Sequence, residues 1–308
     1  MSPVPLIISI ISGAALLLFV LILSLIFIGS ENAIFHVSEN KDVPLLAPFG
    51  RFLSGRCSGG NCPPPCLYAS CMCLLLIFLF IPMGSLPQFV STEADMIIIL
   101  FLLLAAQSFY IRGMKRFSGA LYQSLDRSEI SLLFKFTVAL LTAACSFSWY
   151  VLQRGIPGNI FCVETYAAMP IWNVAGVYGR LGLAAFFLLF AVTSPSRRAA
   201  KSADVGDNVP LPEIFDAIRS MICPAIIAAV FLPWRAGLSF GLTGLALYAA
   251  DFALFWVKVF IIQILVIPPL RTIYLRIKGR LPEKLKLSLV IMLGVVGSGL
   301  MMADLYLL

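Results

Sequence analysis

Ionisable residues within long apolar stretches are the part of this sequence most suited to chemistry. Asp251 and Lys258 lie seven residues apart in the apolar stretch 240–267, so a helix would place them on one face, about two turns apart. Burial of a charge in lipid costs at least about 2.5–3.5 kcal/mol, which makes every such residue a functional candidate. The other candidates for an ion pathway are Glu31, Glu129, Lys135 and Arg180, the last near the middle of the stretch 170–193.

Two interpretations of these charges remain open. A series of acids and bases at mid-depth is what proton movement through a bilayer requires. Lys258 leans towards Asp251, because helical side chains point towards the start of their helix, and the pair would communicate directly or through one water molecule. Alternatively, the charges neutralise one another, or pair with another subunit, and serve only to hold helices together.

The elements that must position these residues are predicted membrane spans. Hydrophobic residues form 60% of the chain, charged residues form 12%, and the mean hydropathy is +0.98, which excludes an ordinary soluble domain. Since a span needs roughly 20 apolar residues, we predict an all-α polytopic membrane protein with about eight transmembrane helices in a single domain, residues 1–308. The predicted spans lie near residues 6–28, 67–89, 95–111, 130–152, 170–193, 217–234, 240–267 and 286–307.

The distribution of basic residues predicts how these spans are oriented. Most of the 22 Lys and Arg residues lie in the segments joining spans 1–2, 3–4, 5–6 and 7–8, whereas the opposite connections carry only Arg154 and Arg235. Because positive charge resists translocation, the basic segments should face the cytoplasm. The sequence thus predicts a multi-pass protein of the cytoplasmic membrane with both termini outside. The net charge of +7 comes from these loops and does not indicate nucleic-acid binding.

The first basic loop contains two features of its own. Residues 43–53 form a proline-bounded amphipathic stretch that should lie in the membrane interface. Cys57, Cys62 and Cys66 are candidate metal or iron–sulfur ligands, but their spacing matches neither a zinc pair nor a ferredoxin pattern, so no metal site is predicted and packing is the default. With His36 as the only histidine, a histidine-based metal site or catalytic triad is not expected.

Four stretches, taken in order, carry a resemblance to a known family. The first is Glu31-Asn32-Ala33 where the family has Glu-Arg-Lys, and the second is Pro44–Phe49 where it has Pro-Leu-Leu-Gln-Pro-Phe/Tyr. The third is Val230–Trp234, where one branch has Phe-Ile-Pro-Trp. The fourth is Val257-Lys258-Val259, followed by Arg271 and Tyr274–Lys278, which is similar to span 7 of the family and its Ala-Arg-Leu-Arg-Ile-Asp cytoplasmic exit. The chain resembles the quinone-site membrane subunit of respiratory complex I. It is more similar to the counterpart of that subunit in energy-converting membrane-bound nickel–iron hydrogenases and formate hydrogenlyase.

The resemblance implies a non-catalytic membrane subunit of a multisubunit oxidoreductase. Such a subunit would anchor the peripheral electron-transfer module and help couple redox chemistry to proton or sodium ion translocation. It would bind no cofactor, since Fe–S clusters and any Ni–Fe site would lie on partner subunits. Basic residues would dock that module, because cationic rims steer association. These residues are Arg51, Arg127, Arg197, Arg198, Arg271, Arg276 and Lys278.

The chain departs from the family at acidic positions. The family's third cytoplasmic loop reads roughly Glu-x-x-Lys-x-Pro-Phe-Asp-x-x-Glu-Ala-Glu, and its four acids correspond here to Phe190, Arg197, Ala200 and Ser202. In one register, the mid-span Glu of span 4 corresponds to Thr137. Either protons take a different route, or the subunit is mainly a docking platform.

Two other functions are alternatives. A quinone-binding subunit of a complex I-like quinone reductase would use the amphipathic stretch and spans 1 and 6 to shape a quinone entry. An autonomous secondary transporter belongs to a different class, and the absence of a visible internal repeat argues against it.

Overall fold

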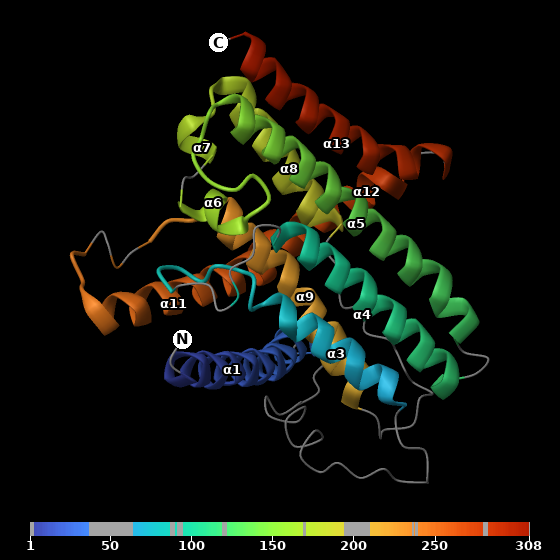
Figure 1. Ribbon diagram of the computed structural model, residues 1–308. Coiled ribbons are helices and arrows are strands. Elements are labelled where there is room, and N and C mark those ends of the chain that lie inside the picture. Colours follow the sequence, from blue (N-terminus) through green and yellow to red (C-terminus); the bar gives the residue numbers. More distant parts are fainter. Residues whose placement is uncertain are drawn as a thin grey trace. The chain divides into compact units, whose positions relative to one another are not determined.

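The computed structural model of the chain consists of α-helices and their connections (Figure 1). It describes residues 3–36, 64–86, 90, 95–118, 122–168, 171–193, 210–235, 237, 240–279 and 283–307, and no strand occurs among them. The all-α prediction is confirmed for these residues. The helices are α1 (Pro3–His36), α3 (Pro65–Ile77), α4 (Asp95–Ser118), α5 (Tyr122–Gln153), α6 (Val163–Ala168), α7 (Ile171–Val174), α8 (Val177–Thr193), α9 (Pro210–Val230), α11 (Gly244–Ile261), α12 (Ile267–Gly279) and α13 (Glu283–Tyr306).

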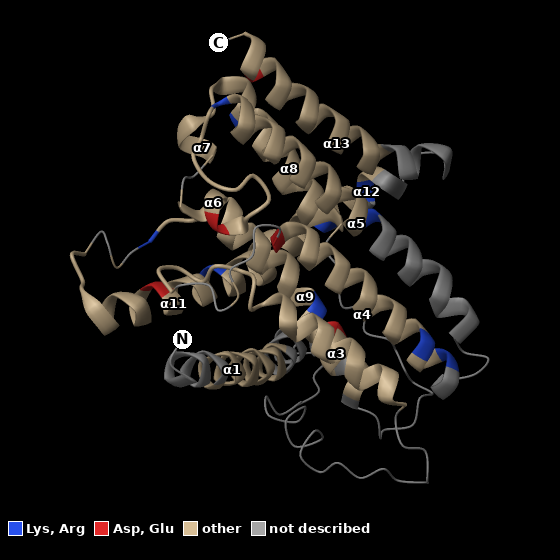
Figure 2. Cartoon of the chain, viewed as in Figure 1, with Lys and Arg blue, Asp and Glu red and all other residues tan. Residues whose placement is uncertain are grey.

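Four apolar helical segments are long enough to cross a membrane. They are Asp95–Lys115, Lys135–Gln153, Gly244–Tyr274 and Leu289–Tyr306. Large apolar side chains such as Phe101, Leu245 and Val295 are exposed on them, and charged side chains are sparse along the described helices (Figure 2). These features are those of a multi-pass membrane protein.

The number of spans stays a prediction beyond these four. Three shorter apolar helices, Ile11–Phe27, Pro65–Ile77 and Val177–Thr193, coincide with other predicted spans. The predicted interfacial segment 43–53 lies outside the described residues.

Two predicted spans are interrupted in the structure. The helix expected over 67–89 ends at Ile77, so α3 is only about 20 Å long. The chain then turns through Pro82, which lacks an N–H, and Gly84, whose φ of 74° lies in the left-handed region. The span expected over 170–193 is divided into α7 and α8, because the backbone leaves the helix at Ala175 and Gly176.

The seventh predicted span is continuous but contains a π-helical turn. This turn, Ile262–Val266, joins α11 to α12, and the N–H of Ile267 bonds to the carbonyl of Ile262. Pro268 and Pro269 follow, and neither can donate to a carbonyl one turn earlier. The wider turn is therefore a local response to two consecutive prolines.

Contacts group the chain into two compact units. The first unit comprises Met1–Leu79, Leu102–Ile130 and Pro195–Ile222, and the second comprises Phe80–Phe101, Ser131–Ser194 and Cys223–Leu308. The second unit holds the buried acids Asp95, Asp251 and Asp304.

The first unit buries a cation among aromatic side chains. Arg219 is 6% exposed, and its Nη1 donates to the side-chain oxygen of Gln107 at 3.5 Å and lies 3.9 Å from the carboxylate of Asp216. Its guanidinium lies over the ring of Phe215, which stacks on Tyr110 with ring centroids 4.0 Å apart. Such contacts compensate a cation for leaving water.

Candidate intramembrane ion site

Asp251 joins α11 to two other parts of the second unit, the turn at Ser85 and the stretch around Gly237. Its side chain is 2% exposed, and both carboxylate oxygens accept hydrogen bonds. The backbone N–H of Gly237 donates to Oδ1 at 2.7 Å, and the hydroxyl of Ser85 donates to Oδ2. Gly84 packs directly on this point, since a Cβ there would lie 2.7 Å from the Cβ of Asp251. Hydrogen bonds from neutral donors thus compensate the buried carboxylate for its loss of contact with water.

Lys258, about two turns further along α11, holds the segment that follows α9. Its ammonium donates to the backbone carbonyl of Leu232 at 2.8 Å and to that of Trp234. The same ammonium lies 5.7 Å from the centre of the Trp234 ring. These carbonyls are available because α9 ends at Val230 and Pro233 interrupts any continuation of the helix. Lys258 therefore bonds to backbone carbonyls of the irregular segment that follows α9.

A small cavity connects the two side chains. Asp251 and Lys258 both line it, together with Trp234, Arg235 and Phe255, and its volume is about 20 Å³, enough for a water molecule. Asp251 also attracts the Lys258 ammonium electrostatically. The structure thus brings the two residues to one cavity, while the hydrogen bonds described above run from each of them to the neighbouring segments.

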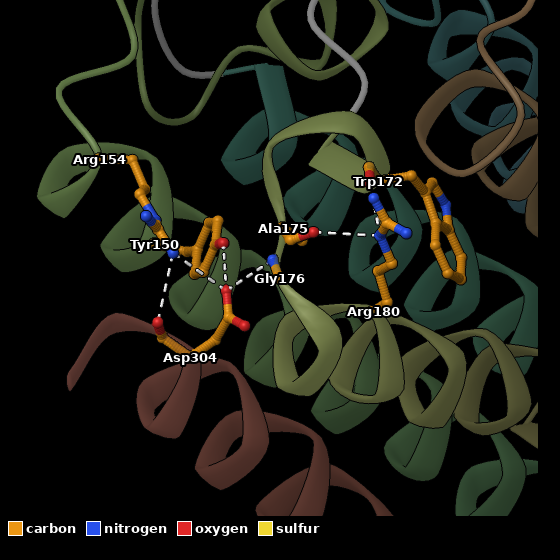
Figure 3. Close-up of polar contacts among 7 residues, drawn as sticks. All are labelled: Tyr150, Arg154, Trp172, Ala175, Gly176, Arg180 and Asp304. Atoms are coloured by element: carbon orange, nitrogen blue, oxygen red, sulfur yellow. Dashed lines mark hydrogen bonds and ion pairs between the residues drawn. The ribbon is translucent and has the colours of Figure 1, made fainter. Parts of the chain in front are cut away.

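The remaining pathway candidates lie elsewhere. Arg180 is exposed in the first turn of α8 instead of near mid-span, and its Nε donates to the carbonyls of Trp172 and Ala175, each at 3.1 Å (Figure 3). Lys135 is half-buried in α5, and neither residue lines the Asp251 cavity. Glu31 lies in α1 and Glu129 in α5, but their side chains are outside the described part of the structure.

The predicted docking and cysteine residues are only partly described. Arg276 is exposed and Arg271 half-buried, both in α12, and Cys66 is a free thiol in α3. Positions 51, 57, 62, 197 and 198 lie outside the described residues, as do the side chains of Arg127 and Lys278. No group of three metal-ligating side chains occurs in the part of the chain that is described.

Asp304 is a second buried acid, and it is not among the candidates that the sequence suggested. Its side chain is 0% exposed, and three donors converge on Oδ2: the hydroxyl of Tyr150 at 2.7 Å, a guanidinium N–H of Arg154 at 3.1 Å and the N–H of Gly176 at 3.0 Å (Figure 3). Its Oδ1 accepts no hydrogen bond from the described residues. This carboxylate ties α13 to the end of α5 and to the break between α7 and α8.

The third buried acid, Asp95, accepts a hydrogen bond from a thiol. The Sγ of Cys162, in the connection between α5 and α6, donates to Oδ2 of Asp95 at 3.1 Å. Burial raises the pKa of the Cys162 thiol to about 11, and the bond to Asp95 acts in the same direction. Cys162 therefore stays protonated at neutral pH.

Asp304 and Arg219 could have been found from the sequence. Each lies within a predicted span, 286–307 or 217–234, where the cost of burying a charge already marks it as a candidate. The partners of Asp304 carry no such signal, because they come from distant parts of the chain, and the same holds for Gln107, which accepts the hydrogen bond of Arg219.

Comparison with known proteins adds no relative. No protein-family model matches the chain, and no curated protein matches its sequence. The functional argument therefore depends on the chain's own residues.

Proposed function

We propose that this chain is an integral membrane subunit of a multisubunit energy-converting oxidoreductase of the hydrogenase-like, complex I-related type. It anchors a peripheral electron-transfer module and helps couple redox chemistry to proton or sodium ion translocation. The subunit carries no cofactor, and Fe–S clusters, with any Ni–Fe site, belong to partner subunits.

The contact between Lys258 and the segment after α9 carries this proposal. The stretches 230–234 and 257–259 are two of the four that resemble the family, and the ammonium of Lys258 bonds to the carbonyl of Trp234. Two stretches that resemble the family independently, 230–234 and 257–259, thus meet at Lys258, in the same cavity as the buried acid Asp251. An amine and a carboxylate that share a cavity in an apolar protein are suited to moving an ion.

Purification in mild detergent tests the subunit assignment. We expect the chain to co-purify with peripheral subunits that contain Fe–S clusters, detectable by mass spectrometry and metal analysis. A chain that isolates alone and transports solute in liposomes would instead be an autonomous transporter. Quinone protection in a binding assay would favour the quinone-reductase alternative.

Charge reversal tests the docking role. Replacing Arg197 and Arg198 by Glu should release the peripheral module while membrane insertion persists, because complementary charges orient association. Lys115→Glu is the matched control, since Lys115 is an exposed cation of the neighbouring predicted cytoplasmic loop. Equal retention of the module by both variants would contradict docking at positions 197 and 198.

Removal of both site charges tests coupling. In Asp251→Asn/Lys258→Met neither charge is left uncompensated, so the complex should assemble. We expect redox turnover to persist while ion uptake into sealed vesicles is lost, with Lys115→Met as the control. Normal ion uptake by the double variant would show that the pair is only structural.

A further inference from the structure

The half-buried ammonium of Lys258 has no opposite charge in direct contact with it. It donates to the carbonyls of Leu232 and Trp234, which are neutral acceptors. Asp251 attracts it electrostatically, but both oxygens of that carboxylate are bonded to other donors. An ammonium has three N–H donors, so one N–H of Lys258 has no acceptor among the described residues, and no described carboxylate forms an ion pair with it.

The cavity beside Lys258 carries an excess of positive charge. One carboxylate, that of Asp251, and two basic side chains, those of Arg235 and Lys258, are among the described residues that line it. Excess charge of one sign is costly in an apolar region. We therefore expect an anionic group from outside the chain to lie against this part of α11.

The depth of Lys258 in its helix argues against a lipid headgroup as that anion. Lys258 lies near the middle of the 31-residue apolar segment Gly244–Tyr274. At about 1.5 Å per residue, each end of this segment is roughly 20 Å away along the helix. A lysine side chain that extends towards the membrane interface spans only a few of these residues. A protein carboxylate is the anion that can reach this depth.

Lys258 borders an exposed apolar face of α11, which we call the α11 face. Val257 and Ile261 are 51% and 46% exposed, and Ala253 is also exposed. These three residues recur every four positions and so share one side of the helix, next to Lys258. The exposed Ala246 extends the α11 face towards the helix start. Small side chains at such positions allow a second transmembrane helix to approach closely.

We propose that a transmembrane helix of another subunit packs along the α11 face and places a carboxylate against the Lys258 ammonium. The partner is thus an apolar helix with an Asp or Glu near its middle. Its carboxylate accepts the third N–H of Lys258 and cancels the excess positive charge, while the bonds to the two carbonyls persist. That the partner belongs to an energy-converting oxidoreductase rests on the proposed function, whereas the pairing itself does not.

Photo-crosslinking in the native membrane tests the partner directly. A benzophenone-bearing phenylalanine in place of Val257 should link this chain to a transmembrane segment of another protein, and mass spectrometry should find an Asp or Glu in that segment. The same replacement at Val295, a 63% exposed valine of α13, is the matched control and should not give this product. Products with lipid alone, or with a second copy of this chain, would overturn the proposal.

A steric variant tests the α11 face without removing any bond of Lys258. Val257→Trp should release the cross-linked partner from the complex purified in mild detergent, because the bulkier ring prevents close helix packing. Val295→Trp should retain the partner. Equal retention of the partner by the two variants would overturn the proposal.

A charge exchange tests the ion pair itself. Lys258→Glu should release the partner because two acids would face each other, and replacing the cross-linked partner acid by Lys in the same complex should restore it. Failure of this exchange to restore the partner to a folded Lys258→Glu chain would exclude the ion pair. Lys258→Met is the milder change, since an acid that loses its cation can bind a proton and become neutral, so that variant should still assemble.

The same measurements separate this proposal from the proposed function. A cross-linked acidic partner in a complex without Fe–S subunits would contradict the oxidoreductase assignment and support the pairing. Co-purification of Fe–S subunits without any cross-link from position 257 to a membrane partner would support the assignment and overturn the pairing.

Discussion

Two buried acids of the second unit, Asp251 and Asp304, are stabilised in different ways. Asp251 receives neutral donors on both oxygens, from Gly237 and Ser85, while its cationic neighbour Lys258 bonds to backbone carbonyls. Asp304 receives three donors on one oxygen, including a guanidinium in an ion pair at 3.1 Å. In the first site the opposite charges have separate partners, and in the second they neutralise each other.

This difference suits the two acids to different roles, the ion site proposed for Asp251 and a structural clamp at Asp304. At Asp304 the opening of the ion pair would leave each charge without its opposite charge, which is costly away from water. At the other site, Asp251 and Lys258 each have backbone or hydroxyl partners of their own, so each would keep these partners if the other charge were removed. Of the two basic residues in the connections predicted to lie outside, Arg154 pairs with Asp304 and Arg235 lines the same cavity as Asp251.

The largest effect should come from Gly84, which supports the Asp251 site. An alanine there combines left-handed backbone strain with overlap against the backbone of α11, whose Asp251 carbonyl carbon would lie 2.8 Å from the new Cβ. Gly84→Ala should cost about 2–5 kcal/mol, measured as loss of thermal stability in detergent. Gly155 has a φ of 63°, but a Cβ added there would have no atom within 4 Å, so Gly155→Ala should cost only roughly 1–2 kcal/mol. Equal losses would contradict close packing at Asp251.

A smaller loss is expected at the glycine that packs against Asp304. A Cβ on Gly179 would lie 2.8 Å from Oδ2 of Asp304, which is a side-chain atom instead of backbone. Gly179→Ala should therefore cost about 1–3 kcal/mol in the same unfolding assay. Gly299, with no atom within 4 Å, provides the control on α13, and a Gly179→Ala variant as stable as Gly299→Ala would remove the evidence for a tight clamp.

Removal of one hydrogen-bond donor from each acid gives a finer comparison of Asp251 with Asp304. Ser85→Ala leaves Oδ2 of Asp251 without its hydroxyl donor and should cost about 1.5–3 kcal/mol, as for hydrogen bonds to charged groups. Tyr150→Phe should cost only about 0.5–1.5 kcal/mol, because Arg154 and Gly176 still donate to Asp304. The exposed Ser108, bonded to a carbonyl of its own helix, is the control. A larger loss of stability for Tyr150→Phe than for Ser85→Ala would reverse the roles given to Asp251 and Asp304.

The smallest effect concerns the third acid, Asp95, through the thiol that it binds. Since the pKa of Cys162 is raised to about 11 from an ordinary value of 9.0, its alkylation by iodoacetamide should be slow near neutral pH and increase steadily towards pH 11. The raised pKa also means that this thiol contributes stability below pH 9 that is lost as the pH passes about 11. Asp95→Asn should move the alkylation profile to lower pH, and an unchanged profile would exclude a role for the carboxylate.

The sequence predicted helices well where apolar runs are long, because every backbone polar group in lipid must be satisfied within its own segment. It was less informative at the ends of α3 and α7. There the chain breaks at Pro82, Gly84 and Gly176, and the effect of each depends on a distant partner such as Asp251 or Asp304.

Only the part of the candidate site that lies on α11 could be predicted from the sequence. The seven-residue spacing of Asp251 and Lys258 follows from helix periodicity. The groups that they bind, namely the hydroxyl of Ser85, the N–H of Gly237 and the carbonyls after α9, lie in the connections between long helices, and the course of these connections depends on tertiary packing. No local pattern specifies that the segment after a helix will present its carbonyls to a lysine on another helix.

The Asp304 clamp has a consequence for biogenesis. Its carboxylate belongs to the helix that the ribosome completes last among those described, whereas its partners Tyr150, Arg154 and Gly176 are synthesised 128 to 154 residues earlier. Throughout that interval these three donors depend on water, lipid headgroups or an insertase. The clamp can therefore close only after α13 has been synthesised, so it forms late in the folding of the second unit.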